Sequence, residues 1–172
     1  AMEYGVIIAP KHLAFNDTEI NRTGISVFMT EQQARENELR GTQGIVENAH
    51  VLGVMTAYNR VGITQDNAHT GLMKNILRNE WGCDGMVITD NVLTQYVNGP
   101  DGVMAGVSIY DAMMSFVTDT LPKYKNDAVI VNAMREACHH NLYAIANSCG
   151  MNGVGANTTI KVTRPTVVTM SI

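Results

Sequence analysis

Charged and aromatic residues are both scarce in this sequence, and neither sign of charge dominates. Charged residues make up 16% of the 172 positions, aromatic residues 6%, and the net charge at pH 7 is −4. Lysine and arginine form no basic stripe, so nucleic acid is not expected as a partner. No apolar run reaches the roughly 18 residues of a membrane-spanning helix, and no amino-terminal signal pattern is present. With 45% hydrophobic residues, the chain predicts one folded domain with a real core.

Cysteine is scarce as well. The three cysteines, Cys83, Cys138 and Cys149, are an odd number and lack the Cys-x-x-Cys spacing of many metal sites. A disulfide framework is therefore not expected. We predict free thiols in the core, with Cys138 on the apolar face of a helix, and we predict no metal or cofactor. The free thiols and the missing signal pattern favour a cytoplasmic location.

Apolar runs without alternation are present, and they predict strands that are covered on both faces. Strands are expected over residues 5–10, 52–57, 85–89 and 105–109. Helices are expected over residues 30–48, 69–81 and 126–148, with a shorter helix near 92–98 before a turn at 98–102. Thr30 and Gln33 form a capping box at the first helix. One face of the last helix carries an apolar row of Val131, Met134, Cys138, Leu142 and Ile145.

Alternating strands and helices are typical of parallel α/β proteins. About four βα units that end in a long helix make half of an eight-stranded barrel, so the predicted fold is α/β, a parallel-strand partial TIM barrel. An open doubly wound sheet is the alternative, but it usually has a glycine-rich phosphate loop after its first strand, and Pro10-Lys11-His12 is no such loop. Residues 1–155 are predicted to form the half-barrel, and residues 156–172 a tail or the start of a next region.

Polar side chains follow three of the expected strands. Lys11 and His12 follow the first strand, Tyr58 the second and Asp90 the third. Carboxyl ends of parallel strands lie on one face, where α/β proteins bind ligands. An ionisable group such as Asp90 at the end of a buried strand costs desolvation unless it is paired or used in chemistry. We therefore expect these side chains to line one site.

Three blocks of sequence resemble the catalytic barrel of glycoside hydrolase family 3, the β-glucosidase family. They are KHLAFNDTEINR (11–22), VMTAYNRV (54–61) and ILRNEWGCDGMVITDN (76–91), and their order and spacing agree with the family. A later stretch, MREACHHNLYAIANSCGMNG (134–153), is similar to the barrel-closing helix of bacterial members whose two main domains occur in swapped order. The resemblance implies that the chain is the second half of the catalytic (β/α)8 barrel domain.

The resemblance also implies a function. A retaining β-glucosidase hydrolyses terminal β-D-glucosyl residues of a β-glucoside or oligosaccharide by double displacement. Asp90 occupies the nucleophile position. Tyr58 would bond to Asp90 and orient it, and Met55 would line the pocket. The substrate-binding positions are Lys11, His12, Arg22, Met55 and Tyr58.

The sequence departs from the family in several places. Asn91 stands where a tryptophan commonly follows the nucleophile, and Ser108 replaces an acidic residue. The first four barrel strands and the general acid/base residue are absent. We expect the missing barrel half and an acid/base-bearing domain of a longer chain as partners. The 172 residues alone should then be inactive and should self-associate through open strand edges.

Two other hypotheses about the function are kept. The protein is a β-xylosidase or another exo-glycosidase of the same family, because Asn91 removes an aromatic wall. Alternatively it is a non-catalytic sugar-binding or structural half-barrel, because retaining chemistry needs a second carboxyl about 5–5.5 Å from the first. The carboxyls that lie close in sequence are only weak candidates for that role: Asp17, Glu19, Asp66, Asp101 and Asp111.

Overall fold

Two parallel strands form the centre of the molecule. The computed structural model describes residues 1–92, 96–112, 119–152, 155 and 157–159. Strand β2 (Gly53–Met55) pairs in parallel with β5 (Met86–Ile88), and Val54 lies opposite Val87. Extended backbone continues this pairing on both sides, through the parallel bridges Leu13–Thr56 and Ile88–Ile109. The parallel α/β architecture predicted from the sequence is therefore present, with four extended segments side by side in chain order.

A second sheet, of three two-residue strands, lies beyond the carboxyl end of β2. Strand β1 (Ser26–Val27) pairs in parallel with β3 (Arg60–Val61). Strand β3 forms an antiparallel hairpin with β4 (Thr64–Gln65). None of these three strands is expected from the sequence, because strands of two residues are too short to produce a periodic pattern.

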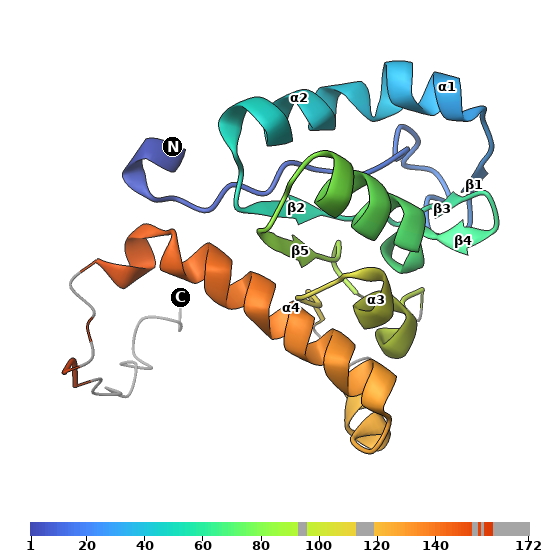
Figure 1. The fold of residues 1–172 in the computed structure, drawn as a ribbon. Coiled ribbons are helices and arrows are strands. Elements are labelled where there is room, and N and C mark those ends of the chain that lie inside the picture. Colours follow the sequence, from blue (N-terminus) through green and yellow to red (C-terminus); the bar gives the residue numbers. More distant parts are fainter. Residues whose placement is uncertain (93–95, 113–118, 153–154, 156, 160–172) are drawn as a thin grey trace, which may run out of the picture.

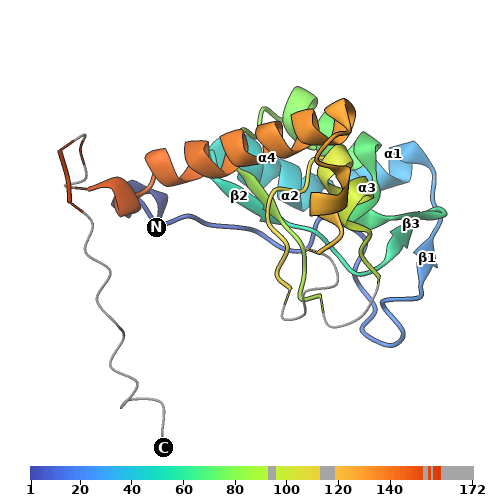
Figure 2. The same cartoon turned by 90° about the horizontal axis from the view of Figure 1, so that it is seen from below.

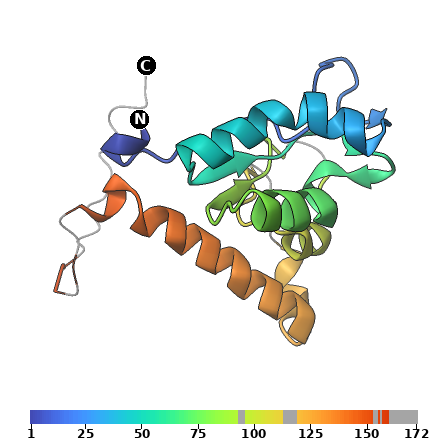
Figure 3. The same ribbon diagram turned by 45° about the horizontal axis from the view of Figure 1, so that its top comes forward.

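Helices cover the strands. Figure 1 shows α1 and α2 above β2 and β5 and α4 below them, and Figure 3 shows α2, the green helix η4 and α4 as neighbouring rods. In the described residues, no helix is both long and apolar enough to cross a membrane. The helical elements are η1 (Met2–Tyr4), α1 (Glu31–Gln33), η2 (Ala34–Glu38), α2 (Arg40–Ala49), η3 (Asp66–Ala68), η4 (Gly71–Glu80), α3 (Gly99–Ala105), η5 (Leu121–Tyr124), α4 (Ala128–Ala146) and η6 (Cys149–Met151).

Side-chain caps explain where several helices begin. The Thr30 hydroxyl accepts a hydrogen bond from the Gln33 backbone N–H at 3.2 Å, so the predicted cap is confirmed. Asp127 caps α4 by accepting from the N–H groups of Val129 and Ile130. Each cap satisfies backbone donors that have no partner inside the helix. Gly82, at φ 68°, follows the end of η4 in the left-handed conformation that glycine adopts readily.

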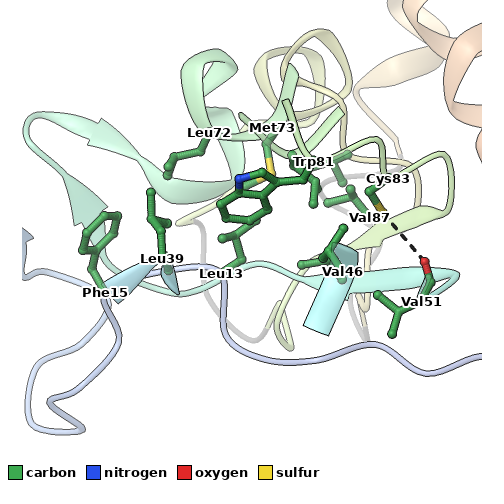
Figure 4. Packing of buried hydrophobic residues seen from close by; sticks show 14 residues of the cluster. Leu13, Phe15, Leu39, Val46, Val51, Leu72, Met73, Trp81, Cys83 and Val87 are labelled. Carbon is green, nitrogen blue, oxygen red and sulfur yellow. Dashed lines mark hydrogen bonds between the residues drawn. The ribbon is translucent and has the colours of Figure 1, made fainter. Parts of the chain in front are cut away.

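The main core lies between the strands and η4. Leu13, Val54 and Val87 from the extended segments are fully buried, as are Met73 and Leu77 from η4. Figure 4 shows Leu13 and Met73 beside the Trp81 ring, with the Cys83 thiol directed at the Val51 carbonyl. Trp81 is itself a buried member of this core. Burial of this apolar surface holds β2 and β5 under η4.

Several predicted boundaries were wrong. Residues 5–10 form no assigned strand; the chain there pairs with β2 only around Pro10 and Leu13, through bonds to Met55. The residues of the expected turn at 98–102 form the start of α3. This helix also includes Ala105, the first residue of the strand expected over 105–109. The helix expected near 92–98 is absent at 96–98, and residues 93–95 lie outside the described part. Proline at the second position of α3 suits a helix start as well as a turn.

The helix expected over 30–48 is interrupted by the π-helical segment η2, and η4 is itself π-helical. Two of the three predicted core thiols are exposed: Cys83 is buried, but Cys138 and Cys149 are not. The apolar row predicted to face the core from α4 is also largely exposed, with Leu142 66% accessible. The buried residues of α4 are instead Ile130, Ala133 and Ala144.

The two ends of the described fold meet. Figure 2 shows η1 beside the carboxyl end of α4. The Cys149 N–H donates to the Gly5 carbonyl at 2.8 Å, which joins the two segments. Most of the predicted tail at 156–172 lies outside the described residues, so the proposed boundary at residue 155 stays a prediction.

Candidate active site

Asp90 lies directly beyond the carboxyl end of β5, where the sequence places it. The backbone around it is tightly held. The Tyr96 hydroxyl donates to the Asp90 carbonyl at 2.8 Å, and the Asn91 N–H donates to Asp90 Oδ1 at 2.8 Å. The preceding Thr89 is fully buried, and its hydroxyl accepts from the Asp111 N–H. The Asp90 side chain keeps 13% of its surface accessible, so the carboxyl is enclosed but not sealed.

His12 is the nearest basic group to Asp90. Its Nε2 lies 2.9 Å from Asp90 Oδ2, although neither atom makes an aligned hydrogen bond. On the other side of the ring, Nδ1 lies 3.2 Å from the Asn16 amide nitrogen. Burial lowers the pKa of His12 more than the Asp90 charge raises it, and the charges of Lys11 and Arg22 lower it further. The imidazole beside Asp90 is therefore neutral at pH 7.

Arg22 supplies the positive charge next to Asp90. One guanidinium nitrogen lies 3.8 Å from Asp90 Oδ2 and 3.2 Å from Glu19 Oε2. The guanidinium also stacks over the Tyr58 ring, 4.2 Å from its centroid. A cation shared between two carboxylates and an aromatic face is held in place while its charge still reaches Asp90.

Tyr58 lies at the site, but its hydroxyl does not bond to Asp90. The hydroxyl donates to the Asn91 carbonyl at 2.5 Å, so the predicted bond to the Asp90 carboxyl was wrong. The ring packs against Tyr96 with centroids 4.7 Å apart. Burial raises the pKa of Tyr58, and the nearby Asp90 charge adds to the effect, so the phenol stays protonated. Tyr58 thus orients the backbone that follows Asp90, because a backbone carbonyl competes well for a phenol donor.

Lys11 and Met55 are less closely tied to Asp90. Lys11 lines a cleft of about 780 Å³ together with His12 and Asn16, and its ammonium makes no ion pair within the described residues. The peptide bond between Lys11 and His12 is cis. Met55 is half-buried in β2, and its backbone joins Pro10 and Leu13. Its role in lining a sugar pocket stays a prediction.

A fully buried carboxyl lies beneath these residues. Asp66 Oδ1 accepts from the Ala14 N–H at 3.1 Å, and Oδ2 accepts from the Ala57 N–H at 2.7 Å. Ala14 belongs to the segment that carries His12, and Ala57 directly precedes Tyr58. Burial raises the pKa of Asp66 well above its ordinary value, and the two N–H bonds only partly oppose this. Asp66 therefore joins the two segments that deliver His12 and Tyr58.

The other candidate carboxyls do not form a pair with Asp90. Asp66 is occupied by backbone donors, and Glu19 reaches Asp90 only through Arg22. Asp17, Asp101 and Asp111 are exposed. No group of three or more histidine, cysteine, aspartate or glutamate side chains that could hold a metal occurs within the described residues.

A comparison with models of known protein families shows the family of this chain. A model described as the glycosyl hydrolase family 3 N terminal domain matches residues 2–123, which is more than half of the chain. The chain belongs to glycosyl hydrolase family 3. The resemblance seen in the three sequence blocks is thereby confirmed. Which half of the barrel the chain represents, and in which domain order, stay predictions.

Individual relatives agree with the family. The chain is 38% identical to probable beta-glucosidase J of Aspergillus fumigatus over 105 residues, 61% of this chain and 12% of that protein. It is 36% identical to a beta-glucosidase of Rhizobium radiobacter over 86 residues, 50% of this chain and 10% of that protein. The chain thus spans about a tenth of the length of these curated relatives.

Solved structures share the fold of this chain. Beta-glucosidase 3B from Thermotoga neapolitana, in complex with glycerol, superposes with a TM-score of 0.78 at 23% identity, over 87% of this chain and 22% of that one. A family 3 beta-glucosidase from Bifidobacterium adolescentis superposes with a TM-score of 0.79 at 21% identity, over 92% of this chain and 23% of that one. These similarities show a common α/β fold.

Three residues at the site were not identified from the sequence: Asn16, Tyr96 and, as a support, Asp66. Asn16 falls inside the first sequence block, so its position was available as a signal. Tyr96 falls in the stretch that was expected to form a short helix near 92–98, and Asp66 appeared only as a weak carboxyl candidate. Their contacts span 4 to 52 residues along the chain. The spacing of residues along the sequence did not indicate that these three belong to the site.

Proposed function

We propose that this chain supplies the nucleophile half of a retaining β-glucosidase, with Asp90 as the nucleophile. The single observation that supports this most is the environment of Asp90. A carboxyl with 13% accessible surface lies at the end of a buried strand, with His12 2.9 Å away and the Arg22 guanidinium 3.8 Å away. A structural carboxylate would be expected to pair fully with its neighbours, whereas Asp90 Oδ2 has no aligned hydrogen bond to any residue that the structure describes.

The proposed chemistry follows from these groups. Asp90 attacks the anomeric carbon and forms a glycosyl ester, while the bond to the leaving oxygen breaks and that oxygen takes a proton from a general acid. Water then attacks the same carbon, gives its proton to the deprotonated general acid, and releases the sugar with the Asp90 carboxylate restored. Arg22 and the Asn91 N–H stabilise the ionised carboxylate before attack. Lys11, His12 and Tyr58 are proposed to surround the sugar, and Met55 to line the pocket.

The general acid and the remaining barrel strands are proposed to come from other parts of a longer protein. The chain matches only 12% of the length of its Aspergillus fumigatus relative. In this proposal residues 1–155 form four βα units of an eight-unit barrel. The substrate would be a terminal β-D-glucoside or a β-linked oligosaccharide.

Mechanism-based labelling tests the assignment of Asp90. The longer protein that contains this chain is treated with 2-deoxy-2-fluoro-β-D-glucosyl fluoride, and the labelled peptide is mapped by mass spectrometry. We expect one label per chain, on Asp90, and none in an Asp90→Asn variant. Asp101→Asn, at an exposed position in α3, serves as the matched control and should label normally. A label on another carboxyl would refute the assignment, and no label on a folded protein would favour a non-catalytic sugar-binding role.

The β-xylosidase alternative rests on Asn91. Its side-chain Oδ1 is buried and has no hydrogen-bond partner in the described part of the chain, so a polar acceptor lies where the family commonly has a tryptophan ring. Comparison of kcat/KM for aryl β-glucoside and aryl β-xyloside in the longer protein separates the two. Faster turnover of the glucoside is expected, and a preference for the xyloside would replace the first proposal by the second.

A further inference from the structure

The His12 ring makes a side-chain contact that determines which nitrogen carries its proton. Asn16 Nδ2 lies 3.2 Å from His12 Nδ1. A carboxamide NH₂ group can donate hydrogen bonds but cannot accept them. Nδ1 must therefore accept, and in a neutral ring the proton then resides on Nε2.

The Asp90 contact selects the same tautomer independently. His12 Nε2 lies 2.9 Å from Asp90 Oδ2, and an ionised carboxylate only accepts. A lone pair on Nε2 would face the carboxylate oxygens and be repelled by them. Rotating the Asn16 amide by 180° would require a proton on Nδ1 and would create that repulsion. Both contacts thus favour one arrangement, with the proton on Nε2.

We propose that Asn16 is a positioning residue that holds neutral His12 as its Nε2–H tautomer and so presents a hydrogen-bond donor into the site beside Asp90. Nε2 is buried and faces Asp90 Oδ2 at 2.9 Å without an aligned hydrogen bond among the described residues, so its proton can also be donated to a ligand atom that enters beside Asp90. A sugar hydroxyl oxygen is a suitable acceptor. That last step rests on the proposed function, whereas the tautomer itself does not.

Other charged groups surround the ring and do not change the assignment. Lys11 and Arg22 disfavour a positive charge on His12, while Asp90 and Glu19 favour it. Burial acts against the charge more strongly than any of them. The His12 ring is therefore neutral at pH 7 and above, and the tautomer is measured in that range.

The chain contains its own reference histidines for the test. His69 Nδ1 accepts from the Leu72 N–H at 3.2 Å, which requires the Nε2–H tautomer. His140 Nδ1 lies 2.8 Å from the Asp84 carbonyl, which can only accept and so requires Nδ1–H. Two-bond ¹H–¹⁵N correlation spectra of the ¹⁵N-labelled chain distinguish the two tautomers. At pH 7 we expect His12 to show the pattern of His69 and the opposite of His140.

Two substitutions at Asn16 sharpen the test. Asn16→Asp replaces the donor by an acceptor while Asp90 stays beside Nε2, so both ring nitrogens then face carboxylates and His12 should show the pattern of the doubly protonated ring. Asn16→Leu removes the donor without replacing it, so the Nε2–H preference should weaken to a mixture. Asn37→Asp is the matched control, because Asn37 lines the same cleft without a bond to His12, and it should leave the His12 pattern unchanged.

The references also report whether each variant is folded. If His69 and His140 keep their patterns, the local structure is intact and the His12 result can be interpreted directly. An Nδ1–H pattern for His12 in the unsubstituted chain would overturn the proposal. So would an unchanged Nε2–H pattern in the folded Asn16→Leu and Asn16→Asp variants.

An activity measurement separates this proposal from the proposed function. In the longer protein, Asn16→Leu should raise KM for an aryl β-glucoside about five- to tenfold, the equivalent of one hydrogen bond to the substrate. If Asn16→Leu alters the tautomer but leaves KM unchanged, Asn16 positions His12, and the proposed contact between His12 and the sugar is refuted. Absence of activity in the unsubstituted protein would refute the proposed function and leave the tautomer assignment standing.

Discussion

Helices η4 and α4 both carry apolar residues at three- and four-residue spacing, yet these residues are buried on one helix and largely exposed on the other. On η4 the periodic residues belong to the core, because Leu72 is buried and Met73 and Leu77 are fully buried. On α4 the periodic row is largely exposed, with Leu142 66% and Ile145 43% accessible. A repeating apolar pattern therefore identified both helices, but it identified the buried face of only one.

The difference follows from what lies next to each helix. Helix η4 lies over β2 and β5, and its apolar stripe fills the space above Val54 and Val87. Helix α4 contacts α3 and β5 through Ile130, Ala133 and Ala144, whose small or compact side chains allow a close approach. Its larger apolar residues face outward. In the proposed complete barrel this outer face of α4 would be a surface for neighbouring units to cover.

The largest contrast is expected between two leucine truncations. Leu77→Ala removes a fully buried side chain from η4, and it should lower the free energy of unfolding by about 2–5 kcal/mol because a cavity is left behind. Leu142→Ala, the same change on α4, should alter it by less than about 0.5 kcal/mol. Urea denaturation followed by circular dichroism measures both. Equal losses for the two variants would show that the outer face of α4 is covered in solution.

A smaller contrast is expected between two aspartates that each accept two backbone N–H bonds. Asp66 does so in the buried region beside η4, and Asp127 does so at the exposed start of α4. Asp66→Asn should cost about 1–3 kcal/mol, because the amide NH₂ then faces a buried N–H. Asp127→Asn should be nearly neutral, because asparagine caps helices as well as aspartate does.

The pH dependence of that cost has a defined sign. The folded-state pKa of Asp66 is raised above its ordinary value of 3.8, so its stabilising contribution is complete below about pH 3.8 and falls as pH rises through the folded pKa. The difference in unfolding free energy between the unsubstituted chain and Asp66→Asn should therefore shrink as pH rises. Urea titrations from pH 4 to pH 8 test this, and a widening difference would show that the carboxylate is stabilised when ionised.

The smallest effect on stability, but a distinct effect on association, is expected from a charge on α4. Leu142→Lys should leave the unfolding free energy within about 0.5 kcal/mol, because the side chain is exposed. We also expect it to weaken self-association, because an exposed apolar row favours contacts between copies. Sedimentation velocity at several concentrations measures this, with Glu136→Lys on the same helix as the charge control. If both variants associate as the unsubstituted chain does, the contact between copies lies elsewhere, for example at the open strand edges.

The elements that the sequence predicted well are those with a strong local signal. The runs at 53–55 and 86–88 became strands, Thr30 became a cap, and α4 begins and ends within two residues of its expected bounds. The short strands of the β1–β3–β4 sheet and the helix α3 were missed. Two-residue strands carry no period, and Gly99-Pro100 suits a turn and a helix start equally well.

At the candidate site the sequence placed His12, Arg22, Tyr58 and Asp90, and the structure brings these four together. The sequence did not predict which atom each side chain bonds to. The Tyr58 hydroxyl reaches the Asn91 carbonyl instead of the Asp90 carboxyl, since its position is set by packing against Tyr96 and Arg22. Burial of Cys138 was predicted from helix periodicity alone, and that proved wrong.

The parallel α/β pattern and the polar residues at the ends of the strands follow from local sequence, because both depend on apolar runs and on the neighbours that follow them directly. Packing in three dimensions was needed to establish which face of α4 is covered, which atom Tyr58 bonds to, and how Asn16 and Asp66 hold the segments around Asp90. These outcomes depend on contacts between residues that are distant in the chain, and their energies appear only when the backbone has brought those residues together.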